Sequence, residues 1–248
     1  MRKVVLVTGG SRGIGAATCV LAAQKGWDVA VNYTSNAKAA DDVVRQVKAA
    51  GGRAIAVQAD VADEGQVLAM FQKVRAELGP LQGLVNNAGV VDVSARLDEM
   101  SMARWRRMFD INVLGSMLCA REAILQMSTL HGGQGGSIVN LSSAAARLGS
   151  PGQYLDYAAA KGAIDSFTLG LAKEIAGEGI RVNAIRPGLI DTEIHASGGL
   201  PNRVKDLEHL VPAKRGGSAM EVAQAIVWLL SDEASYTTMS LIDVSGGR

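Results

Sequence analysis

The sequence predicts an α/β protein built on a doubly wound, seven-stranded parallel sheet with helices on both faces. Short runs of β-branched residues alternate along the chain with longer, alanine-rich segments of helical pattern. Strands separated by helices pair in parallel through right-handed crossovers, which gives an open sheet. The early strands are also apolar throughout, as a sheet covered on both faces requires.

Each element follows from this alternation. Strands are predicted at Val4–Val7, Val29–Tyr33, Ala54–Val57, Gly83–Asn86, Ser137–Leu141, Arg181–Ile185 and Leu241–Val244. Helices are predicted at 14–26, 37–50, 63–78, 101–129, 156–177 and 220–230. No repeat or interdomain linker interrupts the pattern, so residues 1–248 are expected to form a single domain.

The segment 191–217 departs from the alternation. It carries Gly198, Gly199, Pro201 and Pro212 around one short helical pattern, and it is long for a connection in a compact domain. We expect it to be a lid over the substrate site.

Composition limits the possible partners. The chain has 25 basic and 24 acidic residues, without a basic block, so neither nucleic acid nor a membrane surface is an expected partner. Its apolar runs are far shorter than a bilayer requires, and Val4–Val7 is too short for a signal peptide. Two well-separated cysteines predict reduced thiols and a cytoplasmic location. The histidines and cysteines lack metal-ligand spacing, so no metal is expected.

The first functional motif follows the first strand directly. Thr8-Gly9-Gly10-Ser11-Arg12-Gly13-Ile14-Gly15 leads into a helix. Its glycines allow the backbone to approach a pyrophosphate, and the helix N-terminus offers free N–H groups to an anion. Taken alone, the motif fits an ordinary strand-to-helix turn equally well.

Further motifs follow in a fixed order along the chain. They are Asp60-Val61 after the third strand, Asn86-Asn87-Ala88-Gly89 at the fourth, Asn112, Ser143, Tyr157 with Lys161, and Arg186-Pro187-Gly188 with Thr192 beyond it. From about Lys3 to Gly247, this series resembles the classical short-chain dehydrogenase/reductases. Within that family the chain is similar to glucose 1-dehydrogenase-like and uncharacterised NADP-dependent oxidoreductases, and to 3-oxoacyl-carrier-protein reductases.

The resemblance implies a Rossmann fold and hydride transfer between a nicotinamide cofactor and a small molecule, a carbonyl compound or a secondary alcohol. Tyr157 would act as acid/base, Ser143 would donate a hydrogen bond to the reacting oxygen, and Asn112 would anchor a water relay. Lys161, one helical turn from Tyr157, would hold the nicotinamide ribose. As a neighbouring cation it would also lower the tyrosine's pKa. Ser142 also follows the strand, but the family's spacing selects Ser143.

The expected cofactor is NADP(H). The second strand ends without the carboxylate that would hold the ribose hydroxyls of NAD, and Asn32 would leave room for a 2′-phosphate that Arg12 could pair with. The predicted cofactor-binding residues are Gly9, Ser11, Arg12, Gly13, Ile14, Gly15, Asn32, Tyr33, Asp60, Val61, Asn87, Ala88, Gly89, Tyr157, Lys161, Pro187, Gly188, Ile190 and Thr192.

Two alternatives remain open. A 3-oxoacyl-carrier-protein reductase would dock an acidic carrier, for which Arg104, Arg106 and Arg107 are a weak candidate patch. A non-catalytic NADP-binding regulator would keep the fold without turnover.

A homotetramer, or at least a dimer, is also expected. It would form on the helices at 101–129 and 156–177 and on the C-terminal strand. Apolar residues such as Leu118, Phe167 and Leu171 are expected to exceed what the core of one subunit can bury. The resemblance further implies a glycine near Met239, where this chain has none.

Overall fold

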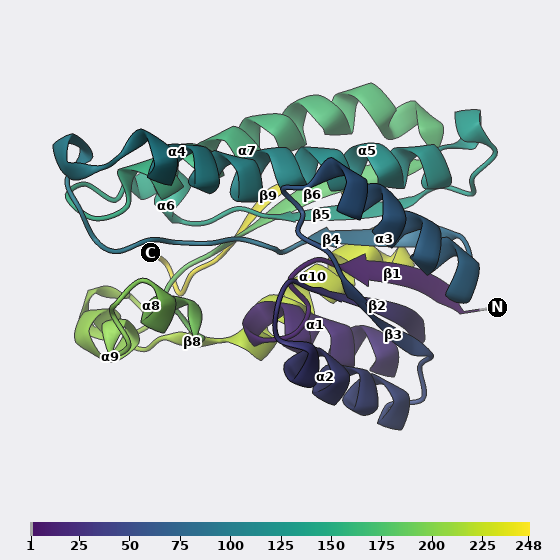
Figure 1. The fold of residues 1–248 in the computed structure, drawn as a ribbon, viewed down its shortest axis with the longest axis horizontal. Coiled ribbons are helices and arrows are strands. Elements are labelled where there is room, and N and C mark those ends of the chain that lie inside the picture. Colours follow the sequence, from purple (N-terminus) through teal and green to yellow (C-terminus); the bar gives the residue numbers. More distant parts are fainter. Residues whose placement is uncertain (1) are drawn as a thin grey trace.

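The computed structural model describes residues 2–248, except for the side chain of His195. Seven parallel strands form one sheet in the order β3-β2-β1-β4-β5-β6-β9 (Figure 1). Every predicted strand is present, with ends shifted by a residue or two, and the predicted fold class is confirmed. The strands are β1 (Lys3–Val7), β2 (Trp27–Tyr33), β3 (Ala54–Gln58), β4 (Leu81–Asn86), β5 (Gly136–Leu141), β6 (Ile180–Pro187) and β9 (Leu241–Val244).

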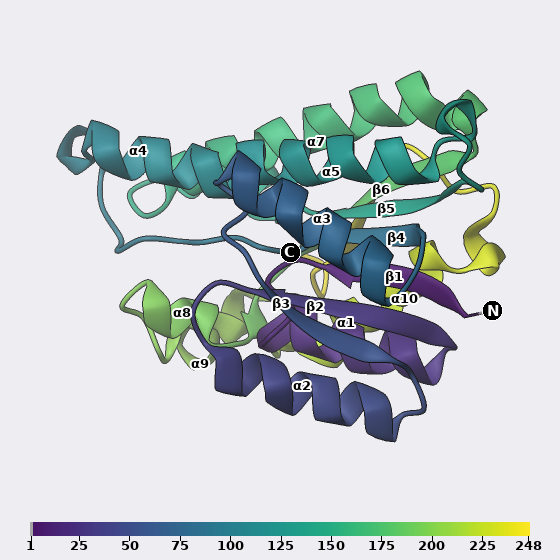
Figure 2. The ribbon, with the colours of Figure 1, turned by 45° about the vertical axis from the view of Figure 1, so that its right-hand side comes forward.

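Helices cover both faces of the sheet (Figures 1 and 2). Those packed on one face are α1 (Gly13–Gln24), α2 (Ala37–Ala49) and α10 (Ala219–Leu230), and those on the other are α3 (Glu64–Glu77), α5 (Gly115–Met127) and α7 (Leu155–Ile175). Two separate apolar cores result, one on each side of the sheet. The core strands show no polar alternation because both faces are buried.

Side chains at the helix ends explain where several helices begin. Asn36 and Asp63 accept hydrogen bonds from backbone N–H groups in the first turns of α2 and α3. Ser218 and Glu221 form a reciprocal capping box at the start of α10. Such caps satisfy donors that a helix leaves free at its N-terminus.

The helix predicted at 101–129 is not continuous. It consists of α4 (Met102–Phe109), a π-helical turn (Asp110–Leu114) and α5. The Asn112 side chain donates to the carbonyl of Met108, one turn earlier, within this irregular stretch. Single π turns inside helices occur frequently at functional sites.

The segment 191–217 has structure that the sequence did not predict. The two-residue strands β7 (Ile190–Asp191) and β8 (Gly217–Ser218) pair in parallel and bring its two ends together. Between them lie α8 (Ile194–Ser197) and α9 (Arg203–Leu207), which Figure 1 shows beside the carboxyl end of the sheet. The segment therefore leaves the main sheet and returns to it with its two ends side by side.

Strand order positions the functional loops. From β1 the chain adds β2 and β3 on one side, and β4, β5, β6 and β9 follow on the other. The strand order reverses between β1 and β4, the point at which open α/β sheets bind ligands beyond their carboxyl ends. Loops after β1, β4 and β5 meet there, and the short helix α6 (Ala145–Leu148) follows β5.

The structure also bears on the expectations for Met239, for the two cysteines and for membrane-spanning helices. Met239 adopts a φ of 64°, a left-handed conformation that favours glycine, where the resemblance implied one. Cys19 and Cys119 are both buried and unpaired with each other. Within residues 2–248, no helix combines the length and apolar character needed to cross a membrane.

Candidate active site

A cavity of about 710 Å³ opens at the carboxyl end of the sheet. Its lining includes every residue predicted to bind the cofactor except Gly15, and every predicted catalytic residue except Asn112. Residues from β1, β2, β4, β5, β6 and the segment 191–217 all contribute to its wall. The sequence motifs therefore converge on one place, while the role of each residue stays a prediction.

Hydrogen bonds hold the glycine-rich segment Thr8–Gly15, here called the phosphate loop, against the loop after β4. The Thr8 hydroxyl accepts from the backbone N–H groups of Asn87 and Ala88, both at 3.0 Å. In return, the Asn87 amide donates to the carbonyl oxygens of Thr8 and Gly9 at 2.8 and 3.0 Å. These contacts fix both loops before any ligand arrives.

Asn32 lines the cavity as predicted, but its side-chain amide is used within the protein. Its side chain is buried, accepts from the N–H of Gly9, and donates to the carbonyl oxygens of Val57 and Ala59. The amide thus joins β2, β3 and the phosphate loop, and it is not free to contact a 2′-phosphate. Tyr33, Thr34 and Ser35, which follow Asn32 in the chain, also line the cavity.

The phosphate loop fits a dinucleotide. A Cβ at Gly15 would lie 2.4 Å from the carbonyl oxygen of Gly9, and Gly13 has a φ of 53°. Only glycine suits both positions, so the loop packs tightly beneath the start of α1. Free N–H groups in the first turn of a helix are suited to bind a pyrophosphate. Thr192 lies across from Gly13, 3.4 Å from where a Cβ would stand.

One cation and one carboxylate line the cavity near the ends of β1 and β3. Arg12 is exposed at the start of α1, and its guanidinium has no hydrogen-bond or ion-pair partner among residues 2–248. Asp60 lines the cavity after β3, and its carboxylate accepts from the N–H of Ala62. Val61 lies beside it in the lining.

Three predicted catalytic side chains meet at the inner wall of the cavity. Ser143 and Tyr157 both line this wall, and the Ser143 side chain is near enough to the tyrosine to lower the pKa of its hydroxyl. The Lys161 ammonium lies 5.5 Å from the centre of the Tyr157 ring and donates to the carbonyl of Leu141 at 2.6 Å. Ser142 instead turns its hydroxyl to the carbonyl of Lys161. The geometry therefore brings Ser143, and not its neighbour, against the tyrosine.

The acid–base properties differ from the expectation for Tyr157. Burial raises the pKa of Tyr157 above its ordinary value, and the Ser143 side chain offsets part of that rise. Burial likewise lowers the pKa of Lys161 to about 8, against the opposing charge of Asp165. The predicted lowering of the tyrosine's pKa by the lysine is therefore not seen in the free protein. Tyr157 therefore carries its proton at neutral pH.

Asn112 has a structural position behind the site. It is fully buried, and its amide exchanges hydrogen bonds with the backbone of Val90 at 3.2 and 3.0 Å. A Cβ on Gly89 would lie 2.7 Å from the Asn112 oxygen and 3.7 Å from the Lys161 ammonium. Asn112 thus holds the loop after β4 close to the lysine. Its part in a water relay stays a prediction.

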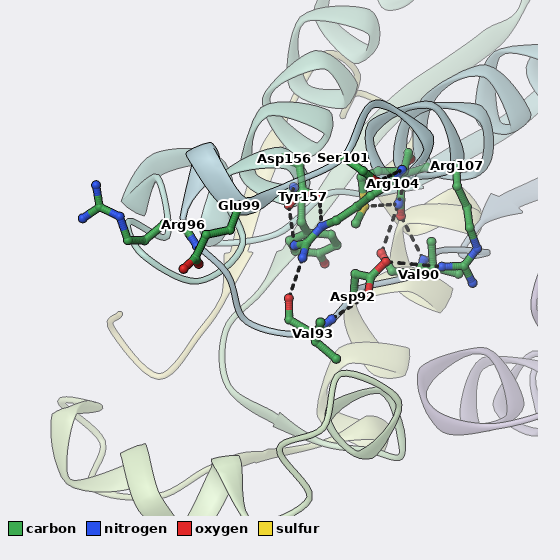
Figure 3. Close-up of polar contacts among 12 residues, drawn as sticks. Val90, Asp92, Val93, Arg96, Glu99, Ser101, Arg104, Arg107, Asp156 and Tyr157 are labelled. Carbon is green, nitrogen blue, oxygen red and sulfur yellow. Dashed lines mark hydrogen bonds and ion pairs between the residues drawn. The ribbon is translucent and has the colours of Figure 1, made fainter.

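A buried ion pair supports the catalytic helix (Figure 3). Arg104 of α4 binds both carboxylate oxygens of Asp156 at 2.7 and 3.1 Å, and it also donates to the carbonyl of Val93. Asp156 immediately precedes Tyr157 and accepts from its N–H at 2.9 Å. The pair ties α4, the loop after β4 and the first turn of α7 together.

This arrangement weakens the predicted carrier-docking patch. Arg104 is used internally, and Arg107 faces Asp92 at 3.9 Å. Of the three arginines only Arg106 is exposed without an ionic partner among the residues described. The patch is therefore not a cluster of free cations.

No sequence motif identified the individual residues at the end of the cavity beside the segment 191–217. The lining there includes Val91, Asp92, Arg107, Leu148, Tyr154, Ile194 and Arg203. Tyr154 is buried, and the Arg203 guanidinium lies 5.0 Å from the centre of its ring. No motif marks these residues, because they come from segments far apart in the sequence.

Comparison with known proteins shows which family the chain resembles. A family model described as enoyl-(acyl carrier protein) reductase matches residues 9–248. The uncharacterised oxidoreductase YgfF of Escherichia coli (strain K12) is 55% identical over 245 residues, covering 99% of each chain. A cis-4-hydroxycyclohexanecarboxylate dehydrogenase of Sinomonas cyclohexanicum is 41% identical over 248 residues, covering 99% of this chain and 96% of the relative.

Solved structures support the same relationship. A short-chain type dehydrogenase/reductase from Mycobacterium marinum superimposes with a TM-score of 0.92 at 33% identity, covering 99% of this chain and 94% of that one.

Proposed function

The chain belongs to the short-chain dehydrogenase/reductase family, and we propose that it interconverts a small carbonyl compound and a secondary alcohol with NADP(H). The single observation that supports this best is the convergence of Ser143, Tyr157 and Lys161 on a cavity that also contains the phosphate loop. The family membership gives the oxidoreductase class. The cofactor preference, the substrate and the roles of the residues are our proposal.

The chain's own residues would act as follows. A bound reduced nicotinamide supplies the hydride. Tyr157 holds a proton on its hydroxyl at neutral pH and gives it to the carbonyl oxygen, where negative charge develops. Ser143 donates a hydrogen bond to that same oxygen, so the transition state gains more than the ground state. In oxidation, Tyr157 would take the proton back.

Lys161 has two proposed tasks. Its ammonium lies close enough to Tyr157 to stabilise any phenolate formed after proton transfer. It also lines the cavity and would donate to the nicotinamide ribose. Its pKa of about 8 leaves it mostly protonated at pH 7, as both tasks require.

Turnover of reduced cofactor tests the reaction class. Purified protein should oxidise NADPH in the presence of at least some members of a panel of ketones and sugars. Tyr157→Phe should bind NADPH with unchanged affinity, yet lose turnover by on the order of 100-fold or more, because the acid is gone. Binding of NADPH without turnover on any carbonyl would instead favour a non-catalytic regulator.

The cofactor preference has its own test. Arg12 can pair with a 2′-phosphate through charge-assisted hydrogen bonds of roughly 1.5–3 kcal/mol each. Arg12→Ala should therefore weaken NADPH binding by roughly 10- to 150-fold and leave NADH binding unchanged. Tyr33→Asp should favour NADH, because Tyr33 ends β2 and lines the cavity, and a carboxylate there would repel a 2′-phosphate. Equal affinity of the wild type for both cofactors would refute the preference.

A 3-oxoacyl-carrier-protein reductase remains the second enzymatic candidate. A reductase of that name from Staphylococcus aureus (strain N315) is 38% identical over 248 residues. The paired arginines of α4 give this candidate little support, and a small substrate is favoured. Two unpaired, buried thiols support the proposed cytoplasmic location.

We also propose that residues 191–217 form a substrate lid and that the protein is a homotetramer or homodimer. The residues that the sequence analysis named for an interface belong largely to the core. Leu171 is buried in that core, and Leu118 and Phe167 are partly buried and pack against the same core. Other apolar side chains on the same helices are exposed, namely Leu114, Met117, Leu125 and Leu169. Light scattering should show an oligomer at micromolar concentration, and a stable monomer would refute it.

A further inference from the structure

Charged side chains at the substrate end of the cavity are mostly neutralised. Asp92 faces Arg107, and Asp156 behind the wall is paired with Arg104. Arg203 differs from these, because it lines the cavity and has no carboxylate partner among residues 2–248. Arg203 therefore lacks a counter-charge from the protein within residues 2–248.

Two neutral contacts hold the Arg203 side chain in place. One terminal nitrogen donates to the side-chain oxygen of Gln153 at 2.8 Å. The guanidinium also lies over the ring of Tyr154, three residues before Tyr157, with 5.0 Å from its carbon to the ring centre. A stacked guanidinium is oriented, and its remaining N–H groups have no partner among the described residues.

We propose that Arg203 is the specificity-determining residue for a carboxylate on the substrate, which would make the preferred substrate a keto acid and its product a hydroxy acid. A planar guanidinium binds a carboxylate through parallel hydrogen bonds, and these are strong where water is partly excluded. Arg203 is half-buried on α9, so an incoming anion would supply the missing counter-charge and join α9 to the start of α7. This inference rests on the proposed carbonyl reduction at Tyr157.

A matched substrate series tests the proposal. Ketones of three lengths, 3-oxobutanoate, 4-oxopentanoate and 5-oxohexanoate, would each be compared with their methyl esters, which lack the charge. The wild type should prefer at least one acid over its ester. Arg203→Gln should raise KM for that acid by roughly 10- to 150-fold, with little change in kcat and none in the ester's constants. Arg203→Lys should restore part of the preference.

Two control variants separate this site from general charge. Lys205→Gln removes an exposed cation from the same helix, and Arg248→Gln removes the other arginine in that part of the lining without a carboxylate partner. Both should keep the preference for acids. Loss of the preference in Arg248→Gln but not in Arg203→Gln would overturn the assignment, as would equal constants for acids and esters in the wild type.

A binding measurement keeps the inference separate from the proposed reaction. Hexanoate and hexanamide differ only in the charged group, and neither can be reduced as a ketone. Calorimetry with NADPH-saturated protein should show hexanoate binding tighter than hexanamide, and Arg203→Gln should abolish the difference. If no ketone is turned over, the proposed function fails while this result still decides the subsite. Failure of hexanoate to bind the wild type would overturn the proposed carboxylate subsite at Arg203.

Discussion

Two segments border the cavity, and different contacts hold them. The catalytic wall, formed by α4, the π turn and the first turns of α7, is joined through Arg104 and Asp156, whose side chains are only 9% and 1% exposed. In the lid, residues 191–217, the Arg203 guanidinium contacts the residues just before α7, and its partners among residues 2–248 are the neutral Gln153 and Tyr154. Figures 1 and 2 show the two segments separated at one end of the molecule.

The difference shows how one fold can keep its chemistry and change its substrate. A buried, bidentate pair fixes the residue next to Tyr157, because breaking it would leave a charge without a partner. Neutral contacts at a partly exposed site cost little to rearrange. On the proposed function, the reaction would take place where the protein is constrained, and substrate selection where a different side chain can be accommodated.

The same substitution at both arginines gives the largest expected contrast. Arg104→Gln should lower the free energy of unfolding by about 3–5 kcal/mol, since it leaves the Asp156 carboxylate buried without its cation. Arg203→Gln should lower it by less than about 1 kcal/mol, because it breaks no ion pair. Urea unfolding of both variants measures the difference, and similar losses would remove the distinction between wall and lid.

Much of the fold and of the candidate site could be predicted from the sequence, but the difference between the contacts of the wall and those of the lid could not. The strands, the helices and the convergence of Tyr157 with Lys161 follow from local periodicity and spacing. The Arg104–Asp156 pair joins residues 52 apart in the chain, and no local pattern indicates such a contact.

The orientation of Asn32 was unreadable for a different reason. Its strand is buried on both faces, so alternation of polar and apolar residues does not show which side chains turn toward the loop. The π turn was also missed, since its residues fit an ordinary helical pattern.

The second largest expected effect is a change of stability with pH, which arises because Lys161 is buried. Because the pKa of Lys161 falls from 10.5 to about 8 on folding, the folded protein binds fewer protons than the unfolded chain between those values. The contribution of Lys161 to stability is constant below about pH 8 and rises from there to about pH 10.5. The total rise is on the order of 3 kcal/mol, since one pKa unit corresponds to about 1.4 kcal/mol.

Comparing the wild type with a variant that lacks the lysine isolates the contribution of Lys161 to the free energy of unfolding. The difference in unfolding free energy between wild type and Lys161→Met should shift in favour of the wild type across this pH range. The exposed lid lysine gives the control, because Lys205→Met should show a flat difference. A flat difference for Lys161→Met as well would show that its pKa is not lowered by burial.

The smallest expected effect concerns the motion of the lid. Trypsin should cut first after Lys205 or Lys214, which are exposed in the lid, and more slowly after Arg106, which is exposed in α4. NADPH together with a carbonyl substrate should protect the lid sites, because a ligand that contacts the lid favours its closed position. Mass spectrometry of the early fragments identifies the first cut. Equal cleavage with and without ligands would argue against a mobile lid.

The fate of the transferred hydrogen tests the central claim most directly. NADPH carrying deuterium at both C4 positions would be incubated with the protein and a ketone that it consumes, and the alcohol would be analysed by mass spectrometry and NMR. The account predicts one deuterium on the carbon that bears the new hydroxyl group, and none in the product from Tyr157→Phe at equal times. Oxidation of NADPH without deuterium at that carbon would contradict carbonyl reduction at this site.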